Sequence, residues 1–306
     1  PFGQKDIGGD LVETAFLMQG LLAVHQYYIN GSPAEQALAG RIDTLWREVD
    51  WNFYRRNDQN VLYWHWSPEY GWEMNFPVHG YNECLIMYIL AAASPTHSIP
   101  ATVYHEGWAE KGAIVDPHKV EDIELPLRYQ GCEAGPLFWA HYSFLGLDPT
   151  NLSDKYCHGY FNEMRNLTLL NRASCIRNPK QWKGFGPDCW GLTASYSVNG
   201  YSAHAPNESA DHGVISPTAA LSSIVYTPEY SLEVMRYLYG MGDKVLGPYG
   251  FYDAFSETED WYPKRYLAID QGPIAVMIEN YRTGLLWKLF MSHHDVQTGL
   301  KKKGIK

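Results

Sequence analysis

The sequence predicts a mostly α-helical fold, and three features of the chain favour it. Apolar residues recur every three or four positions over residues 11–24 and again over 34–49, the spacing that places them on one face of a helix. An Asn30-Gly-Ser-Pro33 break separates these stretches, so a helical hairpin is expected. Strand composition is confined to two short segments, 61–66 and 101–104, neither long enough to carry the architecture.

The rest of the chain repeats this pattern of helices joined by long connections. Helical spacing predicts further helices over residues 80–92, 135–145, 154–173, 217–223, 228–239, 271–281 and 283–291. Trp, His, Gly and Asn are frequent in the connections 51–80, 94–133 and 174–215, which indicates binding loops set on a rigid frame. We expect a single domain over residues 1–306, a closed ring of helical hairpins with a cleft built by loops.

Composition and charge exclude several classes of function. Acidic residues outnumber basic ones by 34 to 24, and the formal net charge of −10 repels nucleic acid and anionic lipid. The longest apolar run, residues 84–93, is about half the roughly 20 residues that a membrane-spanning helix needs. The sequence contains no C-x-x-C, H-x-x-x-H or H-E-x-x-H spacing, so no zinc site is expected.

The cysteines and the first residue bear on the compartment. The odd number of five widely spaced cysteines predicts buried thiols with at most one or two disulfides. The chain begins with Pro1 and not with Met, as an exported protein does once its signal peptide has been removed, or as a trimmed chain does. We expect a periplasmic or extracellular monomer. The cysteines are Cys84, Cys132, Cys157, Cys175 and Cys189.

Acidic side chains in apolar, glycine-marked surroundings stand near both ends of the chain. Two glycines precede Asp10, which makes it a plausible helix N-cap, and Glu13 three residues later shares its helix face. Asp270 has apolar neighbours on both sides, an environment that raises a carboxyl pKa toward the range of a general acid. These acids indicate hydrolysis of carbohydrate.

Aromatic residues make up 15% of the chain, and sugar rings pack their C–H faces on such planes. Trp64, His65 and Trp72 lie in a stretch where a Pro and a Gly prevent a continuous helix, so a cleft-lining loop is expected. Trp190 is followed by hydroxyl residues that suit a sugar subsite, and His204 lies in the next loop. The alternative, in which these rings fill gaps in the core, stays open.

The segment His79-Gly-Tyr-Asn-Glu83 opens an apolar helix. His79, Tyr81 and Asn82 form a polar set that could orient Glu83 as a catalytic acid, while the helix behind them would exclude water. Glu83 could instead serve only to complement the helix dipole.

Motifs spread over nearly the whole chain carry a family resemblance. They are Asp6-Ile-Gly-Gly-Asp10-Leu-Val-Glu13-Thr-Ala, the segment from His79 to Glu83, Trp190-Gly-Leu-Thr-Ala-Ser, and the segments 213–223, 249–255 and 267–284. In these motifs the chain resembles glycoside hydrolase family 144, the bacterial β-1,2-glucanases formerly labelled "putative glucoamylase".

The resemblance implies an all-α fold, an (α/α)6 toroid of helical hairpins with long loops, a few short strands and an acidic central cleft. It implies no metal or organic cofactor and an anomer-inverting hydrolysis of β-1,2-glucan to sophoro-oligosaccharides. Family members carry further helices before the motif that begins here at Asp6, so the toroid is expected to lack N-terminal helices.

The family's acidic machinery would fall on five residues of this chain. Inverting hydrolysis needs a protonated and an ionised carboxyl about 6.5–9.5 Å apart. We expect Glu83 to be the general acid, desolvated by a helix start and an aromatic wall, and Asp270 the base, held ionised by Gln271 and nearby amides. Asp10 is the alternative base. Other residues expected to bind substrate are Asp6, Glu13, Trp64, His65, Trp72, His79, Tyr81, Trp190 and His204.

Other functions remain open on the sequence. One is an exo-acting, sophorose-releasing or glucoamylase-like hydrolase of glucan. Another is a polysaccharide lyase on a similar toroid, although a lyase needs basic residues to neutralise a uronate, and acids predominate in these motifs. The third is a glycan-binding protein with the same aromatic cleft and idle carboxylates.

Overall fold

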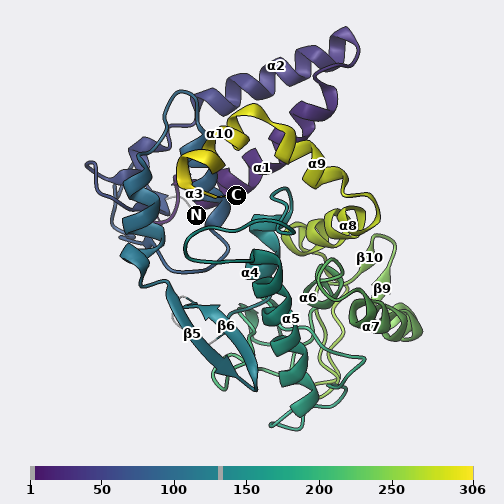
Figure 1. Cartoon of the computed structure of the whole chain (residues 1–306). Coiled ribbons are helices and arrows are strands. Elements are labelled where there is room, and N and C mark those ends of the chain that lie inside the picture. Colours follow the sequence, from purple (N-terminus) through teal and green to yellow (C-terminus); the bar gives the residue numbers. More distant parts are fainter. Residues whose placement is uncertain (1–3, 130–133, 306) are drawn as a thin grey trace. The chain divides into compact units, whose positions relative to one another are not determined.

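The computed structural model describes residues 4–129 and 134–305 (Figure 1). Helices dominate these residues, and the short strands pair in twos, so the prediction of a largely helical chain is confirmed. The chain divides into two compact units. Unit 1 comprises residues 1–116, 143–160 and 285–306, and unit 2 comprises residues 117–142 and 161–284.

The helices of unit 1 begin where the sequence supplies caps. The Asp10 carboxylate accepts a hydrogen bond from the Glu13 N–H and starts the first helix. Ser32 and Glu35 form a reciprocal capping box at the second helix, with Pro33 at its first position. The helices are α1 (Leu11–Tyr28), α2 (Pro33–Glu48), α3 (Leu85–Ala93), α9 (Leu285–Ser292) and α10 (His294–Lys303).

Helix α3 forms the centre of unit 1, because all nine of its residues are buried. Its Tyr88 hydroxyl accepts a hydrogen bond from the Leu62 N–H at 3.0 Å and donates one to the Val78 carbonyl at 2.7 Å. These two bonds fasten a pair of short strands, β2 (Leu62–Tyr63) and β4 (Pro77–Val78), to the core helix.

Helix α10 packs against α3 through a glycine (Figure 1). A Cβ atom added to Gly299 would lie 2.6 Å from the Ala93 Cβ and 2.8 Å from its Cα, so no larger residue allows this approach. The Lys303 ammonium, also buried, donates to the Pro100 carbonyl at 3.0 Å, and burial lowers its pKa to about 8.

The segment 101–104 is a correction, because it is helical where a strand was expected. A π-helix occupies Val103–Trp108, where Gly107 lies against the Asn60 carbonyl. Val103 and Tyr104 are buried in this π-helix, and Thr102 is exposed. Unit 1 also contains the strands β1 (Gly9–Asp10) and β3 (His65–Trp66) and 3₁₀ turns at Asn52–Arg55 and Glu110–Gly112.

Unit 2 contains a hairpin inside a region expected to be a loop. Strands β5 (Val115–Val120), which begins at the edge of unit 1, and β6 (Ile123–Leu127) pair across Glu121 and Asp122, both with positive φ. Non-glycine residues seldom adopt this conformation. Because the turn residues are Glu and Asp, and not the Asn-Gly or Asp-Gly pair typical of a hairpin, the sequence did not predict this hairpin.

Helix α6 packs on both α7 and α8 in unit 2 (Figure 1). The helices there are α4 (Phe138–His141), α5 (Tyr160–Arg177, whose first residue belongs to unit 1), α6 (Pro217–Leu221), α7 (Pro228–Gly240) and α8 (Ala268–Thr283). The hairpins are β7 (Ser195–Ser197) with β8 (Gly200–Ser202) and β9 (Leu246–Gly247) with β10 (Gly250–Phe251); 3₁₀ turns lie at Tyr142–Phe144 and Gly242–Lys244.

Four cysteines lie in the described part of the chain, and all four are buried, free thiols: Cys84, Cys157, Cys175 and Cys189. Cys132 lies outside the described residues. No described helix combines the length and the apolar character needed to cross a bilayer.

Replacing Gly299 by alanine should lower the free energy of unfolding by roughly 1–3 kcal/mol, because the new methyl group overlaps the backbone of Ala93. Gly40→Ala in α2 is the matched control: nothing lies within 4 Å of its added Cβ, so it should stabilise by about 0.5–1 kcal/mol. Urea unfolding of both variants measures the difference. Equal effects at the two positions would contradict the close packing of α10 on α3.

Candidate active site

Asp10 is the best-connected acid of the N-terminal motif. Its Oδ1 accepts the Glu13 N–H at 2.9 Å, and its Oδ2 accepts the Trp64 indole N–H at 3.1 Å. The His65 Nε2 lies 3.5 Å from the same Oδ2, and the Trp64 and His65 rings stack at 5.5 Å. Strand β1 pairs antiparallel with β3 in the register Asp10 opposite His65, so this short pairing of two distant chain segments brings acid, indole and imidazole together.

Glu83 lies just before α3, which begins at Leu85 and so starts later than expected. The side chain is 8% exposed. Its backbone is held by Ser143, whose hydroxyl donates to the Glu83 carbonyl and accepts the Ile86 N–H. A residue from another part of unit 1 therefore caps α3 and fixes the turn that carries Glu83.

Three acids act together on the buried Cys84 thiol. Burial raises the pKa of Cys84 well above its usual range, and the negative charges of Glu83, Asp10 and Glu13 raise it further. Burial and the charge of Asp10 also raise the pKa of Glu13. The structure thus brings Asp10, Glu13 and Glu83, which we call the acidic cluster, within electrostatic reach of the Cys84 thiol.

Aromatic rings from two loops form a wall in unit 1, which we define as Phe53, Tyr54, Tyr63, Trp66 and Trp72. Trp72 is at its centre, with ring centroids 5.3 Å from Phe53, 5.7 Å from Tyr54 and 5.8 Å from Tyr63. The Phe53 ring is 44% exposed. This aromatic wall therefore has both a packed interior and a face open to a ligand.

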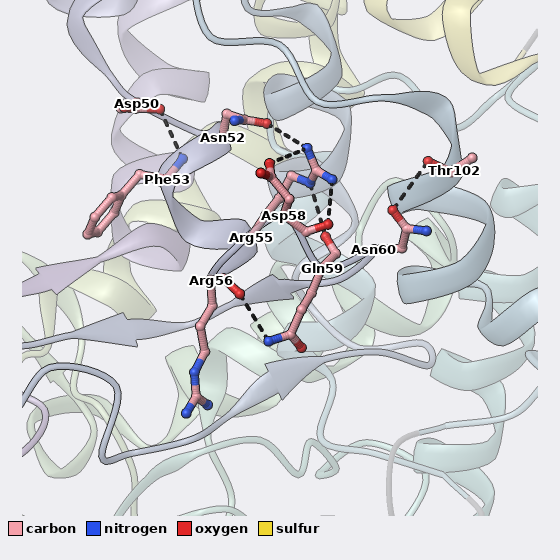
Figure 2. A network of polar contacts seen from close by, with 9 residues as sticks. All are labelled: Asp50, Asn52, Phe53, Arg55, Arg56, Asp58, Gln59, Asn60 and Thr102. Atoms are coloured by element: carbon pink, nitrogen blue, oxygen red, sulfur yellow. Dashed lines mark hydrogen bonds and ion pairs between the residues drawn. The ribbon is translucent and has the colours of Figure 1, made fainter.

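Figure 2 shows how Arg55 holds the loop that carries Tyr54 and Phe53. The Arg55 guanidinium donates to the carbonyls of Gln59 at 3.0 Å and Asp58 at 2.7 Å and to the Asn52 side chain at 3.0 Å. The three residues after Arg55 all have positive φ, a costly conformation for residues other than glycine. The buried guanidinium offsets that cost and keeps the loop in one shape.

Tyr54 connects the aromatic wall to the acidic cluster. A Cβ atom added to Gly9 would lie 1.9 Å from the Tyr54 hydroxyl, so the phenol rests directly on the backbone beside Asp10. Burial raises the pKa of Tyr54 to about 12, and the charge of Asp10 contributes. Sequence reasoning did not single out Tyr54, and the only cue was its position within the aromatic-rich connection 51–80, next to Phe53.

Of the other site residues predicted in this unit, Asp6 and His79 are at least partly exposed and Tyr81 is buried. Asp6 is exposed, and its charge acts on the His65 imidazole. His79 pairs with Glu110, Nδ1 to Oε1 at 3.2 Å, and is partly exposed. Tyr81 is 0% exposed and packs against Trp108 and Tyr160. No part of its ring is open in this structure, and its role in substrate binding stays a prediction.

Asp270 lies in the first turn of α8 in unit 2 and is 1% exposed. Its side chain hydrogen-bonds the Asp253 side chain, and burial together with Asp253 raises the Asp270 pKa to about 9. Gln271 does not hold it ionised as expected, since the Gln271 amide donates to the Phe251 carbonyl at 2.9 Å. Asp253 was missed, although this acid within the aromatic run 249–255 has the same apolar setting that singled out Asp270.

Trp190 and His204 are also enclosed. Both are 0% exposed, and burial lowers the pKa of His204 to about 4. Near Trp190 the hydroxyls bond one another inside the unit, as Ser216 donates to Ser195 at 2.7 Å. The role of Trp190 and His204 in substrate binding stays a prediction.

Within residues 4–129 and 134–305, no group of three or more His, Cys, Asp or Glu side chains could hold a metal ion. The described side chains include both buried and exposed carboxyl groups, and several of these lie beside aromatic rings. Such a combination can bind a neutral polyol ring and move protons at its oxygens.

Helical units that carry acids beside aromatic rings define a class of carbohydrate-active proteins. A family model described as "Glycoamylase: Putative glucoamylase" matches residues 75–294, more than half of the chain. The chain belongs to this family.

Relatives of known structure share the fold. The structure of a "putative glucoamylase" from Bacteroides fragilis NCTC 9343 is 82% identical with a TM-score of 0.99, over 100% of this chain and 72% of that one. An endo-β-1,2-glucanase from Chitinophaga pinensis, in complex with sophorotriose and glucose, is 65% identical with a TM-score of 0.98, over 100% and 73%.

A curated relative is named for its reaction. The exo β-1,2-glucooligosaccharide sophorohydrolase (non-reducing end) of Parabacteroides distasonis is 42% identical over 98% of this chain. The chain spans 44% of the length of that relative.

Gly9→Ala should lower the free energy of unfolding by about 1–3 kcal/mol, because its methyl group meets the Tyr54 hydroxyl and the aromatic wall leaves that ring no room to move. Tyr54→Phe in the same chain removes the obstructing oxygen and should recover most of the loss. A double-mutant cycle by urea unfolding measures this coupling. Additive effects of the two changes would show that Tyr54 does not rest on the Asp10 strand.

The buried Glu163 of α5 predicts a pH dependence of stability. Burial raises its pKa from 4.5 to about 7, against a hydrogen bond from the Tyr129 hydroxyl. A carboxyl group that is protonated more readily in the folded state stabilises the fold. This stabilisation is complete at a pH below the pKa of the group in the unfolded chain, and it is lost as the pH rises through the pKa of the group in the folded state. The free energy of unfolding should therefore fall from about pH 4.5 to about pH 7, and Glu163→Gln should flatten this part of the curve. An unchanged slope in the variant would refute the shift.

Proposed function

We propose that this chain hydrolyses β-1,2-glucan to sophoro-oligosaccharides by an endo-acting, anomer-inverting mechanism. The observation that carries the proposal is the acidic cluster held beside the aromatic wall through Asp10 and Tyr54. Carboxyl groups in such a setting supply the proton transfers of glycosidic cleavage, while aromatic rings bind the C–H faces of glucose.

Similarity to the named relatives supports the substrate. Both the Chitinophaga endo-β-1,2-glucanase and the Parabacteroides sophorohydrolase act on β-1,2-glucosides by name. The endo mode is favoured because identity is 65% to the first relative and 42% to the second. The curated relative, however, is more than twice the length of the matched chain, so its exo mode carries less weight here.

The roles of the carboxyl groups follow from their surroundings. Glu83, buried on a turn fixed by Ser143, is proposed as the general acid that protonates the departing glycosidic oxygen. Asp270 is proposed as the base that activates water, with Asp10 as the alternative base. Asp6 and Glu13, both exposed, are proposed to bind sugar hydroxyls, together with Trp64, His65, Trp72 and His79.

Incubation with linear β-1,2-glucan, laminarin and starch tests the substrate, the cutting mode and the stereochemistry together. We expect a ladder of sophoro-oligosaccharides from β-1,2-glucan alone, with the α-anomer formed first, as followed by proton NMR. Release of sophorose alone would overturn the endo mode, and a β-anomer would overturn inversion. Binding without new reducing ends would establish a glycan-binding protein, and an unsaturated product absorbing in the ultraviolet would establish a lyase.

Glu83→Gln and Asp270→Asn should each lower kcat by about 10²-fold or more, because general acid–base catalysis typically contributes 10²–10⁴-fold. Glu163→Gln is the matched control, since it alters another buried carboxyl outside this machinery. Near-normal turnover in both Glu83→Gln and Asp270→Asn would show that the pairing of these two acids is wrong.

A further inference from the structure

Asp253 and Asp270 form an unusual pair of buried acids in unit 2. Each is 1% exposed, and their side chains hydrogen-bond each other. The Asp253 Oδ1 and the Asp270 Oδ2 are both buried, and no N–H or O–H group of the described residues donates a hydrogen bond to either atom. Two carboxylates cannot hydrogen-bond without a proton, so the contact itself requires one between them.

The surroundings of the pair supply one donor and no neutralising cation. The Tyr196 N–H donates to the Asp253 Oδ2 at 3.0 Å, and the Asp253 N–H donates to the Arg265 carbonyl. The Arg265 guanidinium lies over the Tyr196 ring at 4.9 Å, and the Gln271 amide bonds Phe251. Helix α6, which packs on α8, has no titratable side chain. Among the described residues, no ion pair joins either acid to a basic side chain.

Asp154 is a buried acid in the same chain whose carboxylate oxygens are fully hydrogen-bonded. Asp154 of unit 1 is also buried, yet its oxygens accept hydrogen bonds from two backbone N–H groups and two tyrosine hydroxyls. Such a carboxylate has its negative charge stabilised where it stands. The Asp253–Asp270 pair lacks these donors, so its arrangement is not explained by packing alone.

We propose that Asp253 is a positioning residue for the reaction, which holds one proton jointly with Asp270 and takes that proton when Asp270 acts as the base. This inference rests on the proposed function. A shared proton explains how the buried Asp270 can still accept a proton from water. The proton already on Asp270 moves to Asp253 across the hydrogen bond between them.

The protons balance over one cycle. The resting pair carries one proton and a charge of −1. When Asp270 takes a proton from the attacking water, the pair carries two protons and no charge, while Glu83 gives its proton to the departing sugar oxygen and becomes ionised. Return of one proton from the pair to Glu83 through solvent restores the starting state. No oxidant, metal or further reactant is required.

The pH profile of kcat/KM in Asp253→Asn tests this role. In Asp253→Asn an amide replaces the carboxyl O–H that donates to the ionised Asp270, and this weaker donor stabilises the carboxylate less. The acid limb of the profile, which reports uptake of the second proton by the pair, should therefore move toward higher pH by about one unit or more. Glu163→Gln, which changes a buried carboxyl of the same unit outside the pair, should leave both limbs in place. An unmoved limb in Asp253→Asn would overturn the proposal.

A second measurement does not depend on activity and so separates this proposal from the proposed function. The folded pair holds a proton that two unfolded aspartates release above about pH 5, so the urea midpoint should fall as pH rises from there. Asp270→Asn and Asp253→Asn should each remove the same part of that fall, and the double variant should remove no more. If Asp253→Asn does not fold, Asp270→Asn alone decides. A slope unchanged by these substitutions would refute the shared proton even if the glucan is cleaved.

Discussion

The cost of keeping a carboxyl group away from water is the constraint on which the site of this protein depends. An isolated buried carboxylate is so unfavourable that the protein must supply donors, share a proton or leave the group partly open. The chain uses all three solutions. Asp154 is surrounded by donors, Asp253 and Asp270 share a hydrogen bond, and Asp10 is half-open between a backbone N–H and an indole.

These three solutions separate structural acids from reactive ones. The donors around Asp154 make it an anchor in the core. In the proposed pair of unit 2 the proton can lie on either residue, and that is a requirement for proton transfer. In unit 1, the aromatic wall and the Arg55 loop set the position of Asp10 through Tyr54 and Gly9, so one set of contacts fixes both the aromatic surface and the acid.

Local signals in the sequence predicted helices α1, α2, α3 and α9 of unit 1. The predicted N-cap Asp10 begins α1 in the structure. The π-helix at Val103–Trp108 and the turn at Glu121–Asp122 could not be predicted, because their backbone conformations depend on tertiary contacts and use residues without a local preference for them. The start of a helix also differed from the prediction: α3 begins at Leu85, and a helix from residue 80 was expected.

Burial was the property that the sequence could not supply. Tyr81, Trp190 and His204 stand in motifs with every polar and aromatic feature of a sugar subsite, yet each is enclosed. Asp253 shows the opposite error, since its partner Asp270 lies 17 positions along the chain and no periodicity connects a loop residue to the first turn of a later helix. Pairing between acids on different elements is a tertiary property, and only the fold reveals it.

A carbon-13 NMR titration of the aspartate side-chain carboxyl carbons tests the shared proton most directly. The account predicts that the Asp270 carboxyl keeps the chemical shift of a protonated acid through neutral pH and titrates near its raised pKa of about 9. Titration of Asp270 near its ordinary value of 3.8, independent of Asp253, would contradict it.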